Sequence, residues 1–248
     1  VAQQTGSLQG QGIADGHMGM ALESLGEYRE ALEYHQKALE IAEQTGDVAE
    51  QGIAYASIGS LYDTLGEYED SLQCHHNALA IADATGDVDA QATAYSYIRE
   101  AHRRLGNLGK AVEYQQLELA LAEQQGALDV QARAHNNLAE LHTGLGSMEK
   151  ALLHYQKALT LSKNGGHPED ETRALSGMGA IYQKQGKLSR ALECHQQAIR
   201  TTQHYDDPVG QATHYNELGN VYLVLGNFQY ALQSHCSAWQ LCPEDDSE

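Results

Sequence analysis

Basic residues are scarce in this sequence. Fifteen lysines and arginines face 34 aspartates and glutamates, which gives a formal net charge of −19. Nucleic acids bind clustered lysine and arginine through their phosphates, so this balance excludes nucleic acid as a partner. It also disfavours anionic membrane surfaces and favours solubility. The sequence has no apolar run long enough to cross a bilayer and no signal peptide, so we expect no membrane insertion.

Paired cysteines and catalytic motifs are also lacking. The four cysteines include no C-x-x-C pair, which indicates reduced thiols in a cytoplasmic protein. The sequence holds no G-x-S-x-G, no Cys-His motif, no H-E-x-x-H and no phosphate loop. Isolated Glu and Gln on a helix can position a water, but no single residue is marked out. We therefore expect no enzyme activity, no catalytic residue and no cofactor.

A forty-residue repeat runs through the whole chain. One glycine column recurs at Gly26, Gly66, Gly106, Gly146, Gly186 and Gly226. A second runs Gly46, Gly86, Gly126 and Gly166, with Asp206 in the fifth place. Two columns of small residues follow at fixed offsets: Ala31, Ser71, Ala111, Ala151, Ala191, Ala231; and Ala38, Ala78, Ala158, Ala198, Ala238, with Glu118 as the exception. Self-similarity at this period predicts a solenoid or a propeller.

The spacing of apolar residues within each repeat indicates helices rather than strands. In the second copy, apolar residues recur at helical spacing over 48–65 and 67–85, and no window alternates as a strand would. The glycines stand where a left-handed residue ends each helix. Asp47 is a good N-cap, with Glu50 placed to complete a capping box. Pro168 and Pro208 both fall at a first helical position.

These residues resemble the tetratricopeptide repeat family. The pattern's small residue is Gly19, Gly59, Ala139, Gly179 and Gly219, and its aromatic is Tyr62, Tyr182 and Tyr222. The forty-residue length, the Gly-Asp-x-x-x-Gln/Glu joint and the segment 216–222 (NELGNVY) are most similar to the Pins/LGN group of scaffold proteins, with kinesin light chain and rapsyn as looser relatives. The resemblance implies an all-α, right-handed superhelical solenoid of six helix-turn-helix repeats.

The expected repeats are 7–46, 47–86, 87–126, 127–166, 167–206 and 207–243. Residues 1–6 match the end of a preceding repeat helix, since Thr5-Gly6-Ser7 aligns with Thr45-Gly46-Asp47. Residues 244–248 form an acidic tail, for which we expect no order. This pattern indicates a segment of a longer array, or an array whose first turn has been trimmed.

The third copy departs most from the pattern. Arg99 replaces the small helix A residue, and Glu118 replaces the facing alanine of helix B. A lone buried charge costs several kcal/mol, so the paired change predicts an Arg99–Glu118 ion pair. The alternative is that this repeat opens slightly and Arg99 reaches a ligand.

In tetratricopeptide arrays helix A lines the concave side, and matching positions therefore give a candidate groove. Five of the eight arginines, Arg99, Arg103, Arg104, Arg133 and Arg173, lie on helices A of the third to fifth copies. Guanidinium groups bind carboxylates bidentately, and asparagine amides pair with extended backbone. The predicted peptide-binding residues are Tyr97, Arg103, Arg133, Asn136, Asn137, Glu140, Arg173, Asn216 and Asn220. The alternative is that Glu100 and Glu140 neutralise these arginines locally.

A histidine column on helix B, His35, His75, His195 and His235, suggests a metal site at first sight. Members forty residues apart lie on helices separated by about 10 Å, too far for one metal with bonds near ~2 Å. Adjacent His75 and His76 point in different directions. We therefore interpret these histidines as structural and expect no metal.

Two hypotheses about function remain. The first, which we prefer, is a non-catalytic adaptor that holds an extended, acidic partner peptide in the concave groove. The second is a structural array that self-associates through uncapped ends or through the outer, tyrosine-bearing face of helices B.

Overall fold

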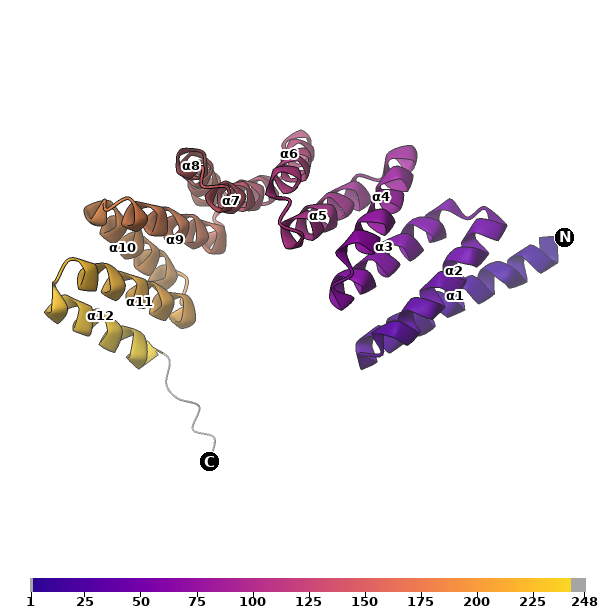
Figure 1. The fold of residues 1–248 in the computed structure, drawn as a ribbon, viewed down its shortest axis with the longest axis horizontal. Coiled ribbons are helices and arrows are strands. Elements are labelled where there is room, and N and C mark those ends of the chain that lie inside the picture. Colours follow the sequence, from indigo (N-terminus) through magenta and orange to yellow (C-terminus); the bar gives the residue numbers. More distant parts are fainter. Residues whose placement is uncertain (1, 242–248) are drawn as a thin grey trace, which may run out of the picture. The chain divides into compact units, whose positions relative to one another are not determined.

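The computed structural model describes residues 2–241, and it is all-α throughout that range (Figure 1). Consecutive helices pack as antiparallel pairs, one pair to a repeat, and this confirms the helix-turn-helix architecture. The twelve helices described within 2–241 are α1 (Ala2–Leu25), α2 (Tyr28–Thr45), α3 (Val48–Leu65), α4 (Tyr68–Thr85), α5 (Val88–Arg104), α6 (Leu108–Gln125), α7 (Leu128–Gly144), α8 (Met148–Gly165), α9 (Pro168–Lys184), α10 (Leu188–His204), α11 (Pro208–Val224) and α12 (Phe228–Leu241).

The chain divides into two compact units, Val1–Leu121 and Ala122–Glu248, each with its own core. In the first unit α1 packs on α2, α2 on α3, α3 on α4 and α4 on α5. In the second unit the same sequential packing joins α7 to α12. Helices α7 and α9, both helices A, also contact each other directly, and so do α3 and α5. None of the helices in the described part of the chain is long and apolar enough to cross a membrane.

The glycine columns end the helices, as the pattern predicts. Gly66 has φ +79° and Gly86 has φ +71°, and every other glycine of the two columns is also left-handed. Asp206 takes the same conformation, with φ 55°, in the one place of the second column where glycine is missing. These residues close each repeat with a tight turn because glycine has no Cβ to resist a positive φ.

Helix starts also follow the sequence, with one correction. Helix α3 begins at Val48 after Asp47, whose side chain accepts the N–H of Glu50 at 3.2 Å. The reciprocal half of the predicted capping box is wrong. The N–H of Asp47 donates to the carbonyl of Ala42 at 2.9 Å, because the turn that ends the preceding helix has already used it.

The predicted boundary at Gly6 is wrong as well. Helix α1 runs without interruption from Ala2 to Leu25, through Gly6 and Ser7. Glycine permits a left-handed turn but does not impose one, and Gly6 is not among the left-handed glycines. The acidic tail 244–248 lies outside the described residues.

The core is a line of small residues between paired helices. Alanines make up more than half of the buried apolar residues, and Ala31, Ala111, Ala151, Ala158, Ala191 and Ala198 of the two alanine columns are fully buried. In the second unit Tyr155, Met178, Ile181, Tyr182 and Val221 form one cluster with five alanines: Ala139, Ala151, Ala158, Ala174 and Ala191. Small residues at these positions let the helices approach closely, and this places the helix B histidines against the helix A glycines.

Candidate functional site

A cavity of about 470 Å³ opens in the first unit between α3, α4 and α5. Its wall is mostly apolar and small. Ala56 of α3 stands where the third to sixth repeats carry serine or asparagine, Ala94 of α5 also lines the cavity, and Ile53 lies at its edge. Pockets that take small ligands or side chains measure roughly 300–1,000 Å³, so this one has room for a large apolar side chain.

Tyr97 closes one side of the cavity. Its ring stacks on His75 with 4.6 Å between centroids and 7° between planes. Both residues line the cavity, and Tyr97 is 36% exposed whereas His75 is buried. The structure thus places Tyr97, a predicted groove residue, at the rim of a pocket that the sequence analysis did not predict.

A group of arginines follows Tyr97 along α5. Arg103 and Arg104 each donate from Nε to the carboxylate of Glu100 at 2.8 Å, and Nη1 of Arg99 lies 3.6 Å from it. Bonding to Arg103, with Arg104 and Arg99 adding to it, lowers the pKa of Glu100 to about 2 although burial opposes the shift. One carboxylate therefore faces three guanidinium groups, and the predicted local pairing with Glu100 occurs without cancelling the positive charge.

Arg99 and Glu118 also come together, in a loose contact. Nε of Arg99 lies 3.9 Å from Oε2 of Glu118, which suits an ionic contact and is too long for a hydrogen bond. Oε2 of Glu118 accepts the amide of buried Gln115 at 2.9 Å, and Arg99 donates to Ser96 at 3.1 Å. In this repeat a polar group replaces the contact that glycine and histidine make in repeats 1, 2, 5 and 6.

In the second unit four of the seven predicted groove residues take part in polar contacts between α7 and α9. Arg173 of α9 donates to Glu140 at 2.7 Å and to Asn137 at 2.9 Å, both on α7. Asn136 is fully buried, and its amide donates to the backbone and side chain of Asp170. The remaining three stand apart from this group. Asn216 lies 3.0 Å from His235, Asn220 is exposed, and Arg133 is exposed with no ion-pair or hydrogen-bond partner in the described part of the chain.

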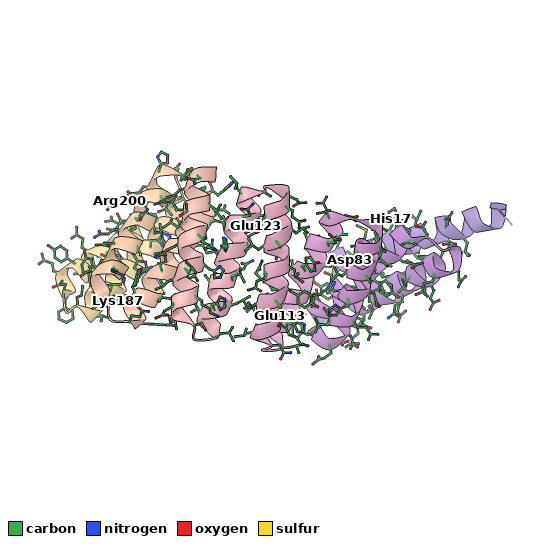
Figure 2. All side chains as sticks on the ribbon, turned by 90° about the horizontal axis from the view of Figure 1, so that it is seen from above. His17, Asp83, Glu113, Glu123, Lys187 and Arg200 are labelled. Atoms are coloured by element: carbon green, nitrogen blue, oxygen red, sulfur yellow. The ribbon has the colours of Figure 1, made fainter. Side chains whose placement is uncertain are left out.

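A second polar cluster joins α9, α10 and α11. Oε2 of Glu217 lies 3.0 Å from Nδ1 of His195, 3.2 Å from Nδ1 of His214 and 3.1 Å from the hydroxyl of Ser176. Figure 2 labels Lys187, which precedes α10, and Arg200, which lies in the C-terminal part of this helix; α10 also carries His195. Burial acts to raise the pKa of Glu217, but the imidazoles of His195 and His214 beside the carboxylate outweigh it and lower that pKa to about 2.

This cluster was not predicted from the sequence, because its two histidines belong to different columns of the repeat. His214 lies 19 residues after His195 and belongs to helix A of the next repeat. The same offset joins His135 to His154, with 3.1 Å between their Nδ1 atoms, and Asn216 to His235. A search at this offset, together with the His214-x-x-Glu217 spacing, would have found it.

The paired helices and repeated turns define a helical-repeat protein. More specifically, the chain belongs to the tetratricopeptide repeat family: one family model matches residues 11–84 and 170–243, and a second matches residues 132–164. Arrays of this repeat are generally protein–protein interaction domains and are typically non-catalytic. No curated protein matches the sequence.

Solved structures share the fold at low identity. A signal transduction ATPase with a tetratricopeptide repeat sensor, from Pyrococcus horikoshii, matches at 21% identity and TM-score 0.80, over 94% of this chain and 37% of that one. BtubC (BKLC) from P. vanneervenii matches at 21% and 0.71, over 89% of this chain and 96% of that one. A putative kinesin light chain from Podosopora anserina matches at 14% and 0.63, over 79% and 96%. At these identities the likeness concerns the fold alone.

Proposed function

We propose that this chain is an adaptor that binds an extended partner peptide on helices A of the first unit. The peptide places an apolar side chain in the cavity between α3, α4 and α5 and an acidic residue against the arginines of α5. The observation that carries this proposal is the combination on one helix face of an open apolar cavity and a local excess of guanidinium groups in a strongly acidic chain.

The spacing on α5 defines the expected peptide. Thr93, Tyr97, Glu100 and Arg104 follow one another at the helical positions i, i+4, i+7 and i+11 and therefore share a face. Tyr97 at the cavity and Arg104 lie seven residues apart, about 10.5 Å along the helix axis. An extended chain covers that distance in about three residues. We therefore expect an apolar residue with a carboxylate about three positions away.

The binding mode combines two familiar forces. Burying one leucine-sized side chain contributes about 1.5–3 kcal/mol, and a charge-assisted hydrogen bond to an arginine about 1.5–3 kcal/mol. Arg104 is suited to this role because half of its side chain is exposed while Glu100 holds the group in place. The forty-residue repeat length and the Gly-Asp-x-x-x-Gln/Glu joint resemble those of the Pins/LGN group of scaffold proteins, and this likeness supports an adaptor role.

Fluorescence anisotropy with a labelled synthetic peptide tests the proposal. The probe is a nine-residue peptide with a central leucine and a pair of glutamates beginning three positions later. Ala56→Leu, which fills the cavity, and Arg104→Glu, which reverses the charge, are each expected to weaken binding at least tenfold. Arg200→Glu, an exposed arginine of α10, is the matched control and should leave binding unchanged.

Two further outcomes bear on the proposal. A peptide with lysines in place of glutamates should bind at least tenfold more weakly, and this difference in affinity should shrink as the salt concentration rises. Equal binding by all three variants would overturn the proposed site. Circular dichroism on each variant separates loss of binding from loss of fold.

Self-association is the second candidate function, and one observation favours it. Helix α12 exposes Phe228, Leu232 and Trp239, each at least 67% accessible. Here the partner is a second copy of this chain. Light scattering across protein concentration distinguishes the two functions: a mass that rises with concentration and returns to the monomer value in Leu232→Glu favours assembly, and a constant mass favours the adaptor.

A further inference from the structure

The cluster around Glu217 has the donor set of a transition-metal site. His195 and His214 offer imidazole nitrogens and Glu217 a carboxylate, and the donor atoms of these three residues lie within 4.8 Å of one another. Within the described part of the chain, this is the group of three such side chains that meets that spacing. Nitrogen with a single carboxylate favours zinc-like ions over magnesium or calcium, which prefer all-oxygen sites.

The distances fit a small tetrahedral ion. Zinc bonds of about 2.0–2.1 Å put neighbouring ligand atoms roughly 3.3–3.4 Å apart in a tetrahedron. Oε2 of Glu217 lies 3.0 Å from Nδ1 of His195 and 3.2 Å from Nδ1 of His214. Both distances are within a few tenths of an ångström of this spacing, and the two imidazole donor atoms lie within 4.8 Å of each other.

His195 has no other evident use for its ring nitrogens. The side chain is 2% exposed, yet neither nitrogen has a hydrogen-bond partner within the described residues, because its 3.0 Å approach to Glu217 lacks the alignment of a hydrogen bond. A buried polar group without a partner is costly. An ion bound to His195 and Glu217 together would give the Nδ1 atom of His195 a partner and would share the carboxylate of Glu217.

The cluster is specific to one place in the array. Shifting its four positions by 120 residues, three repeats, gives Ala56, His75, Ala94 and Tyr97, which line the cavity of the first unit. Shifting by 40 gives Asn136, Tyr155, Ala174 and Gly177, where the tyrosine ring fills the space over the glycine. The helix B histidine thus recurs, but a second histidine and a carboxylate join it only between repeats 5 and 6 among these three sets.

We propose that His195, His214 and Glu217 bind one zinc-class divalent ion in the second unit, with the hydroxyl of Ser176 or a water in the fourth position. The site ties helix B of repeat 5 to helix A of repeat 6. Glu217 is about one-third exposed and therefore gives the ion a path from solvent. The charge of the ion also balances the partly buried carboxylate.

Titration of the tag-free chain with Zn²⁺ and with Co²⁺ tests this site. We expect one Zn²⁺ per chain, visible absorption bands of four-coordinate Co²⁺, and a thermal midpoint that rises with Zn²⁺ concentration. Mg²⁺ and Ca²⁺ should produce neither effect. The Co²⁺ bands report the ligand set directly and do not depend on the partner peptide.

Variants taken from the chain's own repeats keep the fold while removing ligands. His214→Ala installs the residue found at Ala94, Ala134 and Ala174, and Glu217→Asn installs that of Asn137. Each should weaken Zn²⁺ binding at least tenfold and abolish the Co²⁺ bands. His204→Gln, an exposed histidine of α10, should change neither. Absence of Zn²⁺ binding, or binding that His214→Ala leaves unchanged, would overturn the proposal.

Discussion

At the residue scale, the histidines of helices B explain why the helix A positions that face them are glycine. A Cβ built on Gly59 would lie 2.6 Å from the ring of His75, and one built on Gly179 would lie 2.6 Å from the ring of His195. Repeat 4 has Ala139 and Tyr155 at these two positions, and there the ring lies against Gly177 instead. The size of the helix B side chain thus determines which helix A glycine its ring contacts.

Gly179→Ala tests this packing. We expect it to lower the free energy of unfolding by about 1–3 kcal/mol, the usual cost of overpacking a core. Gly16→Ala is the matched control, because nothing lies within 4 Å of a Cβ there and the residue is inside α1. That change should stabilise the protein by up to about 1 kcal/mol. Urea unfolding measures both, and equal effects would contradict the packing argument.

At the element scale, the forty-residue period of the sequence predicted most of the fold. Helix α3 was predicted over 48–65 and is observed over Val48–Leu65, because glycine turns and an aspartate cap are local signals. The contents of the space between repeats could not be predicted in the same way. Ala56 and Ala94 line the same cavity, and His195 lies close to His214, because three helices bring residues of different columns together.

Asp206 offers a test of the turn that ends α10. Its φ of 55° costs an L-residue about 1–2 kcal/mol, somewhat less for aspartate, whereas glycine adopts it freely. Asp206→Gly should therefore raise the free energy of unfolding, by up to about 1 kcal/mol. Neighbouring Asp207 caps α11 by accepting the N–H of Gly210 at 2.9 Å. Asp207→Ala should lower stability by about 1 kcal/mol, and a gain from that change would contradict the assignment of the two roles.

At the scale of the whole molecule, charge and buried histidine oppose each other as the pH falls. A net charge of −19 destabilises a folded chain through repulsion, and protonation relieves it. Most carboxylates take up protons only near pH 4, however, and charges farther apart than about 10 Å are screened at ordinary salt. Between pH 6.5 and 5 the histidines therefore decide the outcome.

His135 and His154 are the pair that should dominate this range. Their Nδ1 atoms lie 3.1 Å apart, an arrangement that requires at least one neutral ring. Burial lowers the pKa of both to about 4; Lys157 adds to the effect on His135, and charged neighbours including His142 add to it on His154. An unfolded histidine titrates near ~6.5. Their contribution to stability is therefore complete above about pH 6.5 and is lost as the pH falls toward 4.

We expect the free energy of unfolding to decrease between pH 6.5 and 5, despite the relief of acidic repulsion over the same interval. The double variant His135→Gln/His154→Gln should flatten this dependence, because glutamine keeps a hydrogen-bonding group and takes up no proton. The control His17→Gln/His204→Gln removes two exposed histidines and should leave the slope as it is in the wild type. Stability that rises on acidification in all three proteins would mean that repulsion between carboxylates outweighs the cost of charging the buried pair.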